Sequence, residues 1–448
     1  MRILIIGAGN TGRNLALKLC EMDHDVVIVD HDPEQLAALD AQLDLMTVLG
    51  EGSSPEVLVK AELSKADLVV AVTSGDEVNI LACQFAYAAG VAHKVARVSN
   101  PALAHSTLLD FKQLGVDLMI SQNEEVSREI FDVLRNPGLT ELTELLDGRL
   151  VIAGVRVKKG GPLLKGSLAE LHAEPMVSSA RFVARVRDEH LSLPYGETRF
   201  QVGDDLYVAI TPEHLPTFLD WVYPGRRAFG KTVLAGGGGL GLDLAHRMEA
   251  GRMPAVLLER DAVRAGECSE SLKSTLVLHG DASDRETLIN AGVGDNTAFV
   301  AITGDEELNI IGCMLAHKLG ATFTLAQVTK PDYVPVIRGL GLLDSVVSPH
   351  QCMVNAILHF VRGQHVKAAV RLGRVPGEFL HVAIRKRHRW VGKPIYKVKM
   401  PGRCLIASVC RDDQIHVPTG DLILQAGDQL VMFALPADVD RVDNAFKS

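Results

Sequence analysis

Residues 2–12 read RILIIGAGNTG, an apolar run that leads directly into Gly7, Gly9 and Gly12. The run is typical of a buried strand in a parallel sheet, and the glycines have the G-x-G-x-x-G spacing of a turn between a strand and a helix. The helix is expected over residues 13–21, with its first backbone N–H groups directed at a pyrophosphate. The stretch therefore predicts a Rossmann-like lobe that binds a nucleotide.

The second apolar run, at residues 25–29, is followed by Asp30. A carboxylate about 20 residues after the glycines accepts hydrogen bonds from ribose hydroxyls and repels a 2′-phosphate. Asp30 therefore favours NAD or an adenosine nucleotide over NADP. Asp32 and Pro33 come next and have the pattern of a helix start, with Asp32 as the N-cap.

The same motif occurs again in the second half of the chain, where Gly236, Gly238 and Gly241 follow the apolar run 232–235. Glu259 then stands where the first copy has Asp30. Further pairs of equivalent residues follow the third, fourth and fifth apolar runs of the two copies: Glu51 and Asp281, Thr73 and Thr303, and Arg97 and Gln327. Because the carboxyl ends of parallel strands share one edge of a sheet, these residues are expected to converge on two nucleotide sites. The second site lacks the guanidinium that Arg97 supplies to the first.

Each Rossmann-like copy is followed by a different pattern. After a helix expected at residues 124–134, Asn136-Pro137-Gly138 breaks the regular structure, and short alternating segments indicate a small α+β domain with antiparallel strands. The fold class is thus α/β, with two doubly wound parallel sheets, each followed by a small α+β domain. The expected Rossmann-like lobes are residues 1–138 and 229–366, and the expected small domains are residues 139–225 and 367–448.

Composition excludes several other classes of protein. The formal net charge of −9 argues against a nucleic-acid partner. The apolar runs are far shorter than the about 20 residues of a membrane-spanning helix, and the first strand begins at Met1, so a cytosolic protein is expected. The seven cysteines form no C-x-x-C pair, which favours reduced, buried thiols over disulfides or a metal site.

The sequence offers no catalytic constellation. It has no H-E-x-x-H or G-x-S-x-G motif, so no catalytic residue is assigned. Residues 225–232 match the P-loop pattern G-x-x-x-x-G-K-[ST], but Lys231 and Thr232 lead into a strand rather than a helix, and the match is interpreted as a linker. Ser53, after the third apolar run, is interpreted as the cap of the helix that follows it.

The duplicated chain resembles the TrkA-type peripheral subunits of bacterial Trk potassium uptake systems. The resemblance rests on the glycine motif, Asp30, GEGS at residues 50–53, VAVTSGDEVN at residues 70–79 and Ala96-Arg97-Val98. The resemblance covers nearly the whole chain. It implies two RCK N-terminal domains that bind NAD(H), ATP or ADP, each followed by an RCK C-terminal domain. It also implies a homotetramer, peripheral on the cytoplasmic face of the inner membrane, that gates a membrane-embedded potassium-translocating subunit.

The motifs, the strand ends and the resemblance together predict two sets of cofactor-binding residues, and no metal ligand is assigned. The first set is Gly7, Ala8, Gly9, Asn10, Thr11, Gly12, Asp30, Glu51, Thr73, Ser74 and Arg97. The second set is Gly236, Gly237, Gly238, Gly239, Leu240, Gly241, Glu259, Asp281 and Thr303. Two alternatives stay open: an NAD-dependent oxidoreductase with duplicated lobes, and a regulator of another ion channel or exchanger.

Overall fold

The structure is a computed structural model of the chain. It describes residues 1–447 apart from residues 23, 105–109, 147, 188–189, 331–332, 334–335, 338–342, 366–368, 373–374 and 413. The predicted boundary at residues 366 and 367 lies outside the described residues. Within the described residues, no helix is both long enough and apolar enough to span a membrane.

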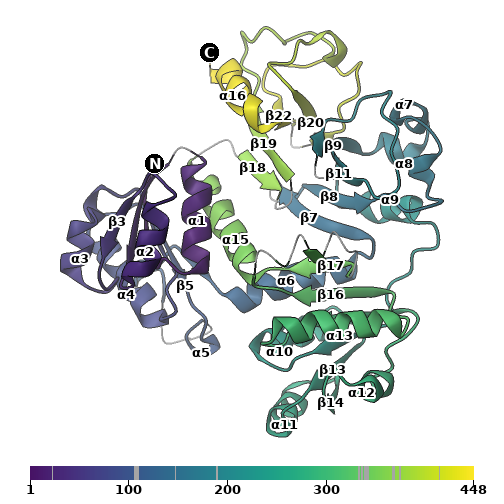
Figure 1. Cartoon of the computed structure of the whole chain (residues 1–448). Coiled ribbons are helices and arrows are strands. Elements are labelled where there is room, and N and C mark those ends of the chain that lie inside the picture. The colour runs from purple at the N-terminus through teal and green to yellow at the C-terminus, as the bar shows by residue number, and fades with distance from the viewer. Residues whose placement is uncertain are drawn as a thin grey trace. The chain divides into compact units, whose positions relative to one another are not determined.

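The first Rossmann-like lobe is built on a six-stranded parallel sheet in the order β3-β2-β1-β4-β5-β6 (Figure 1). Its apolar runs form the strands, and the order reverses between β1 and β4, which is where such sheets bind ligands. Its elements are β1 (Arg2–Ile6), α1 (Asn10–Cys20), β2 (Asp25–Asp30), α2 (Pro33–Asp40), β3 (Met46–Leu49), α3 (Pro55–Lys60), β4 (Leu68–Ala71), α4 (Asp76–Ala88), β5 (His93–Arg97), α5 (Pro101–Ala104), β6 (Leu118–Ile120) and α6 (Gln122–Arg135).

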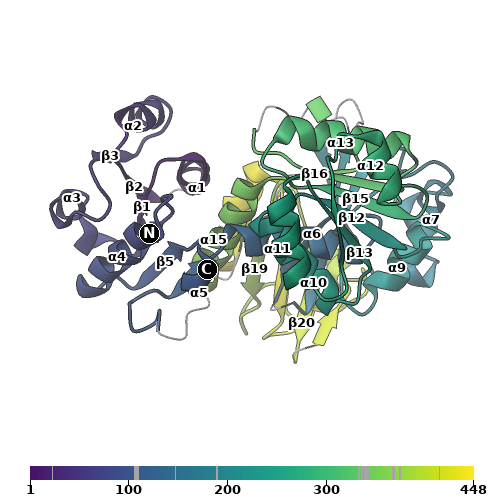
Figure 2. The ribbon, with the colours of Figure 1, turned by 90° about the horizontal axis from the view of Figure 1, so that it is seen from below.

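The second lobe repeats this plan, with the strand order β14-β13-β12-β15-β16-β17. Figure 2 shows α10 and α11 on one side of this sheet and α12 and α13 on the other. Its elements are β12 (Lys231–Ala235), α10 (Gly239–Ala250), β13 (Ala255–Glu259), α11 (Ala262–Ser271), β14 (Leu276–His279), α12 (Arg285–Asn290), β15 (Thr297–Ala301), α13 (Glu306–Lys318), β16 (Phe323–Gln327), β17 (Ser345–Val347) and α15 (Pro349–His365).

The two small domains are five-stranded antiparallel sheets, as the alternating segments predicted. The first domain comprises β7 (Leu139–Leu145), β8 (Leu150–Arg156), α7 (Leu168–Leu171), α8 (Pro175–Ser178), β9 (Arg181–Arg187), β10 (His190–Ser192), β11 (Asp205–Ile210) and α9 (Leu215–Val222). The second comprises β18 (Ala369–Leu372), β19 (Val375–Ala383), β20 (Cys404–Arg411), β21 (Gln414–His416), β22 (Gln429–Ala434) and α16 (Val439–Lys447). Buried side chains of both sheets, such as Ile152 and Phe433, form one shared core.

The chain groups into two compact units. The first holds both Rossmann-like lobes, residues Met1–Phe131 and Gly230–Phe360, and the second holds both small domains, residues Asp132–Phe229 and Val361–Ser448. Two of the three boundaries between the units fall inside a helix, because α6 and α15 each begin in the first unit and end in the second, and the third lies directly before β12.

Candidate nucleotide-binding sites

The first glycine turn joins β1 to α1 and leaves open space beside its middle glycine. Gly7 adopts a φ of +107°, and a Cβ there would lie 3.0 Å from the backbone nitrogen of Thr73. A Cβ on Gly12 would lie 1.8 Å from the carbonyl oxygen of Gly7, whereas a Cβ on Gly9 would meet no atom within 4 Å. The outer glycines are therefore required for packing, and the middle glycine leaves room for a ligand against the backbone.

The helix α1 begins within this turn, three residues earlier than the predicted start at residue 13. Its N-cap is Gly9, and no side chain among the described residues caps it. The first N–H groups of an uncapped helix lack partners and carry the positive end of the helix dipole. Gly9 and Asn10 are exposed, so an anionic group such as a pyrophosphate can reach these N–H groups.

Asp30 is the last residue of β2, and its carboxylate accepts hydrogen bonds from the glycine turn and from the residues after β2. One of its carboxylate oxygens accepts the N–H of Ala8 at 2.5 Å, and the other accepts the N–H of Asp32 at 2.9 Å. A carboxylate oxygen has a second lone pair, so both remain able to accept a ribose hydroxyl. Asp32 accepts the N–H groups of Glu34 and Gln35 as the N-cap of α2, which confirms that prediction.

The loops after β4 and β5 are tied to each other by Asn79 of α4, which is fully buried. Its Oδ1 accepts the N–H of Thr73 at 2.9 Å, and its Nδ2 donates to the carbonyl of Arg97, also at 2.9 Å. Thr73 and Arg97 therefore lie at the sheet edge that also carries the glycine turn. Ser74 and Glu51 are exposed in the neighbouring loops.

Arg97 is the cationic group of this edge. Its Nε donates to the hydroxyl of Ser99 at 3.2 Å. Burial lowers the pKa of its guanidinium, and the nearby carboxylate of Asp76 acts in the opposite direction. A guanidinium at the carboxyl end of a strand is suited to meet a phosphate.

The second lobe repeats these contacts nearly atom for atom. A Cβ on Gly241 would lie 1.8 Å from the carbonyl oxygen of Gly236, and a Cβ on Gly238 would meet no atom within 4 Å. Glu259 accepts the N–H of Gly237 at 2.6 Å, as Asp30 accepts that of Ala8. The N–H of Thr303 donates to Asn309 at 2.9 Å. The turn residues Gly239 and Leu240 begin α10.

Two features distinguish the second site from the first. Gln327 ends β16 at the place of Arg97, so no charge stands there. Instead, the guanidinium of Arg264 on α11 donates to the carbonyl of Gly237 at 2.7 Å, a contact that sequence reasoning missed.

Asp281 accepts the N–H and the hydroxyl of Ser283, and these bonds lower the pKa of its carboxyl group. Asp281 therefore also closes the turn after β14.

Each glycine turn is in addition contacted by the other lobe. His350, near the start of α15, lies 3.3 Å from Asn10 Nδ2 through its Nε2 and 3.2 Å from Thr11 Oγ1 through its Nδ1. Asn123, near the start of α6, occupies the corresponding place at the second turn, where a Cβ on Gly239 would lie 2.8 Å from its Nδ2. Helices α6 and α15 are thus exchanged between the lobes.

Known protein families and relatives share this order of domains. The TrkA-N domain model matches residues 3–122 and 232–349, and the TrkA-C domain model matches residues 152–223 and 381–447. The Trk system potassium uptake protein TrkA of Azorhizobium caulinodans is 32% identical over 453 residues, covering 100% of this chain and 99% of the relative. The chain belongs to the TrkA family.

Two further similarities extend over the whole chain. The Trk system potassium uptake protein TrkA of Halomonas elongata is 30% identical and covers 99% of this TrkA-family chain and 98% of the relative. A solved structure of the GsuK channel bound to NAD superposes with a TM-score of 0.62 at 21% identity, covering 100% of this chain and 79% of that chain. The structural similarity confirms the fold expected for RCK domains.

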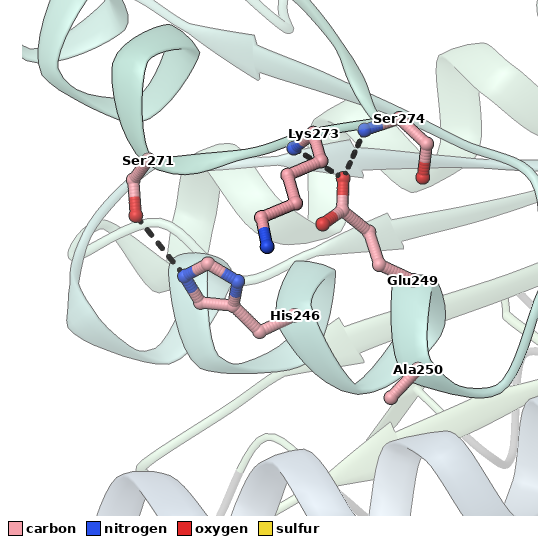
Figure 3. A pocket seen from close by; sticks show the side chains of 6 residues that line it. All are labelled: His246, Glu249, Ala250, Ser271, Lys273 and Ser274. Atoms are coloured by element: carbon pink, nitrogen blue, oxygen red, sulfur yellow. Dashed lines mark hydrogen bonds between the residues drawn. The ribbon is translucent and has the colours of Figure 1, made fainter.

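A pocket of this TrkA-family chain lies away from both glycine turns, beside the carboxyl-terminal half of α10 (Figure 3). Glu249 accepts the N–H groups of Lys273, Ser274 and Thr275 there. Although burial alone would raise its pKa, these N–H groups lower the pKa of Glu249 to about 2. The carboxylate is used to fix the loop before β14, so its role is structural.

Two smaller predictions about loops have opposite outcomes. Lys231 begins β12 and its Nζ donates to the carbonyl of Ala291 at 2.9 Å, which confirms that residues 225–232 are not a P-loop. The prediction that Ser53 caps α3 is wrong. The N-cap of that helix is Ser54, because the N–H of Ser54 closes a turn onto the carbonyl of Glu51 and delays the helix by one residue.

Proposed function

We propose that this chain is the nucleotide-binding regulatory subunit of a Trk-type potassium uptake system. Two uncapped helix N-termini, each behind a glycine that leaves open space and beside a carboxylate at the end of the next strand, support nucleotide binding. The relatives that share its full length are named potassium uptake proteins. NAD(H), ATP or ADP is favoured over NADP(H) as the ligand, because Asp30 and Glu259 disfavour a 2′-phosphate.

The residues that hold the ligand are proposed to be those of the two sheet edges. In the first site, Gly9 and the first turn of α1 bind the pyrophosphate, Asp30 binds the ribose and Arg97 meets a phosphate. The remaining members of the first site are Gly7, Ala8, Asn10, Thr11, Gly12, Glu51, Thr73 and Ser74. The second site comprises Gly236, Gly237, Gly238, Gly239, Leu240, Gly241, Glu259, Asp281 and Thr303.

Regulation follows from binding when the ligand prefers one of two states of the protein. A nucleotide that binds one state more tightly shifts the population toward it, and the coupling to a partner is reciprocal. We propose that the partner is a membrane-embedded potassium-translocating subunit, contacted from the cytoplasmic face by a homotetramer of this chain. The protein then acts as a sensor and not as an enzyme.

Filling the open space at each middle glycine tests the proposal. Gly9 has a φ of −63°, and its Cβ would meet no atom within 4 Å, so Gly9→Val blocks the ligand without strain in the turn. Gly238→Val does the same in the second lobe and serves as the matched control. Calorimetry with NADH, NAD, ATP and ADP is expected to show loss of one site in each variant and of both in the double variant.

Transport measurements connect binding to function. Potassium uptake by cells that contain the membrane subunit is expected to respond to nucleotide with the unaltered chain and to lose that response with the double variant. Binding of all four nucleotides that is unaffected by both substitutions would place the ligand elsewhere and contradict the proposed sites. Unaltered nucleotide-dependent uptake with the double variant would contradict the regulatory role.

A further inference from the structure

The imidazole of His350 lies directly against the first turn of α1, although it belongs to the other lobe. When Nε2 accepts a hydrogen bond from the amide of Asn10, Nδ1 carries the ring proton and donates to the hydroxyl of Thr11. Both ring nitrogens of the neutral imidazole are thereby used. The two residues that they contact directly follow Gly9, the glycine beside which the space is open.

The two influences that shift the pKa of His350, its burial and a nearby guanidinium, both favour the neutral imidazole. Burial and the guanidinium of Arg97 on β5 lower the pKa of the imidazole below its usual 6.5. The contacting side chains on α1, Asn10 and Thr11, are uncharged. The carboxylates of Glu125 and Glu129 on α6 face Cys352, one helical half-turn further along α15. At neutral pH the imidazole is therefore uncharged and lies near the guanidinium of Arg97.

Binding of a phosphate reverses this balance. A pyrophosphate at the N-terminus of α1 brings negative charge to the edge that holds Arg97 and His350. An anion close to an imidazole favours its protonated form, in which both nitrogens donate hydrogen bonds. The ring can then donate to a phosphate oxygen while Thr11 Oγ1 continues to accept from Nδ1.

We propose that His350 of the second lobe is a phosphate-contacting residue of the first nucleotide site, and that nucleotide binding there is accompanied by proton uptake on its imidazole. This inference rests on the proposed function. The second site has no such coupling, because Asn123 stands at the equivalent position and an amide does not titrate. The two sites of one chain thus differ in their response to pH.

Calorimetry in buffers of different ionisation enthalpy measures the proton uptake directly. The full-length Gly238→Val variant leaves only the first site, and NADH is the probe. We expect uptake of a fraction of one proton per NADH at about pH 7, with an affinity that rises up to about tenfold per pH unit as the pH falls. His350→Gln is expected to abolish both the uptake and the pH dependence, and Asn123→Ala is expected to leave them unchanged.

The reciprocal variant is Asn123→His in the Gly9→Val background, where only the second site remains and proton uptake is expected to appear. Thermal unfolding of each variant establishes that it is folded. NADH binding without proton uptake, or uptake that persists in His350→Gln, would overturn the inference and leave the proposed function intact. No NADH binding by the unaltered chain would overturn both.

Discussion

The carbonyl oxygen of Gly7 occupies the space that a side chain on Gly12 would need, since a Cβ there would lie 1.8 Å from it. Gly236 and Gly241 have the same relationship in the second lobe, also at 1.8 Å. The start of each helix therefore packs onto the end of the preceding strand through backbone atoms. The middle glycines, Gly9 and Gly238, take no part in this packing.

This relationship predicts that the glycines of one motif differ in their effect on stability. Gly12→Ala is expected to lower the free energy of unfolding of the first lobe by about 3 kcal/mol, because the turn must shift to admit the methyl group. Gly9→Ala is expected to leave it within about 0.5 kcal/mol. Urea unfolding followed by circular dichroism compares the two, and equal losses would contradict the packing role of Gly12.

The difference between Arg97 and Gln327 predicts that the two sites can be interconverted in affinity. Arg97→Gln is expected to weaken ADP binding at the first site about tenfold, because a charge-assisted hydrogen bond to phosphate is lost. Gln327→Arg is expected to strengthen ADP binding at the second site. Calorimetry on variants in which the other site is blocked measures each change, and an unchanged first site would exclude a phosphate contact by Arg97.

A buried ion pair of the second small domain predicts sensitivity to acid. Asp428 is buried and accepts two bonds from Arg411, at 2.7 and 2.9 Å. Burial alone would raise the pKa of Asp428, but the bond from Arg411 holds it below its usual value. The pair therefore stabilises the fold above about pH 4, and this contribution disappears as the pH falls through the lowered pKa.

Asp428→Asn is accordingly expected to lower the melting temperature at pH 7 and to differ less from the unaltered chain as the pH falls below about 4. Arg411→Met is expected to cost about 3 kcal/mol, because it leaves a buried charge without its partner. Arg389→Met, at an exposed position, is the matched control. A difference that stays constant from pH 7 into acid would show that the carboxylate charge is not what stabilises this domain.

Glu249 predicts a similar pH dependence in the second lobe. Its pKa of about 2 means that the bonds to the loop at residues 273–275 are fully present above about pH 5 and are lost progressively as the pH falls toward 2. Glu249→Gln is expected to lower the melting temperature at pH 7, with a gap that narrows in acid. His246→Gln, which alters the same pocket, is expected to change it little, and equal effects of the two substitutions would contradict the anchoring role.

The sequence was sufficient for the architecture because most strands of the parallel sheets are short segments dominated by apolar residues, such as RILII in β1 and LVVA in β4. The strand β1 matches the predicted run at residues 2–6, and β2 extends the run predicted at residues 25–29 by one residue, Asp30. Helix starts were less predictable. The backbone of α1 is already helical from Asn10, where glycine spacing suggested a loop, so Asn10 and Thr11 form the first turn of the helix.

The predicted site residues of each copy lie at one sheet edge because the repeat and the strand order determine their position. His350, Asn123 and Arg264 were missed for a physical reason. His350 meets Thr11 across 339 positions of the chain, and such a contact leaves no trace in periodicity or motif spacing. The internal repeat offered one usable signal. His350 and Asn123 are each the second residue of a helix that begins two positions after the last strand of its copy.

The exchanged helices also bear on how such a chain can evolve. Helix α6 follows α10 of the other copy, with Arg247 donating to Ser127 at 2.8 Å and Phe131 beside Gly251. A chain of half this length would have to pair with an identical chain to cover that helix, and symmetry would then impose the same residue at both glycine turns. Fusion into one polypeptide removes that constraint. In one polypeptide the two turns can carry different residues, and this chain has histidine at one and asparagine at the other.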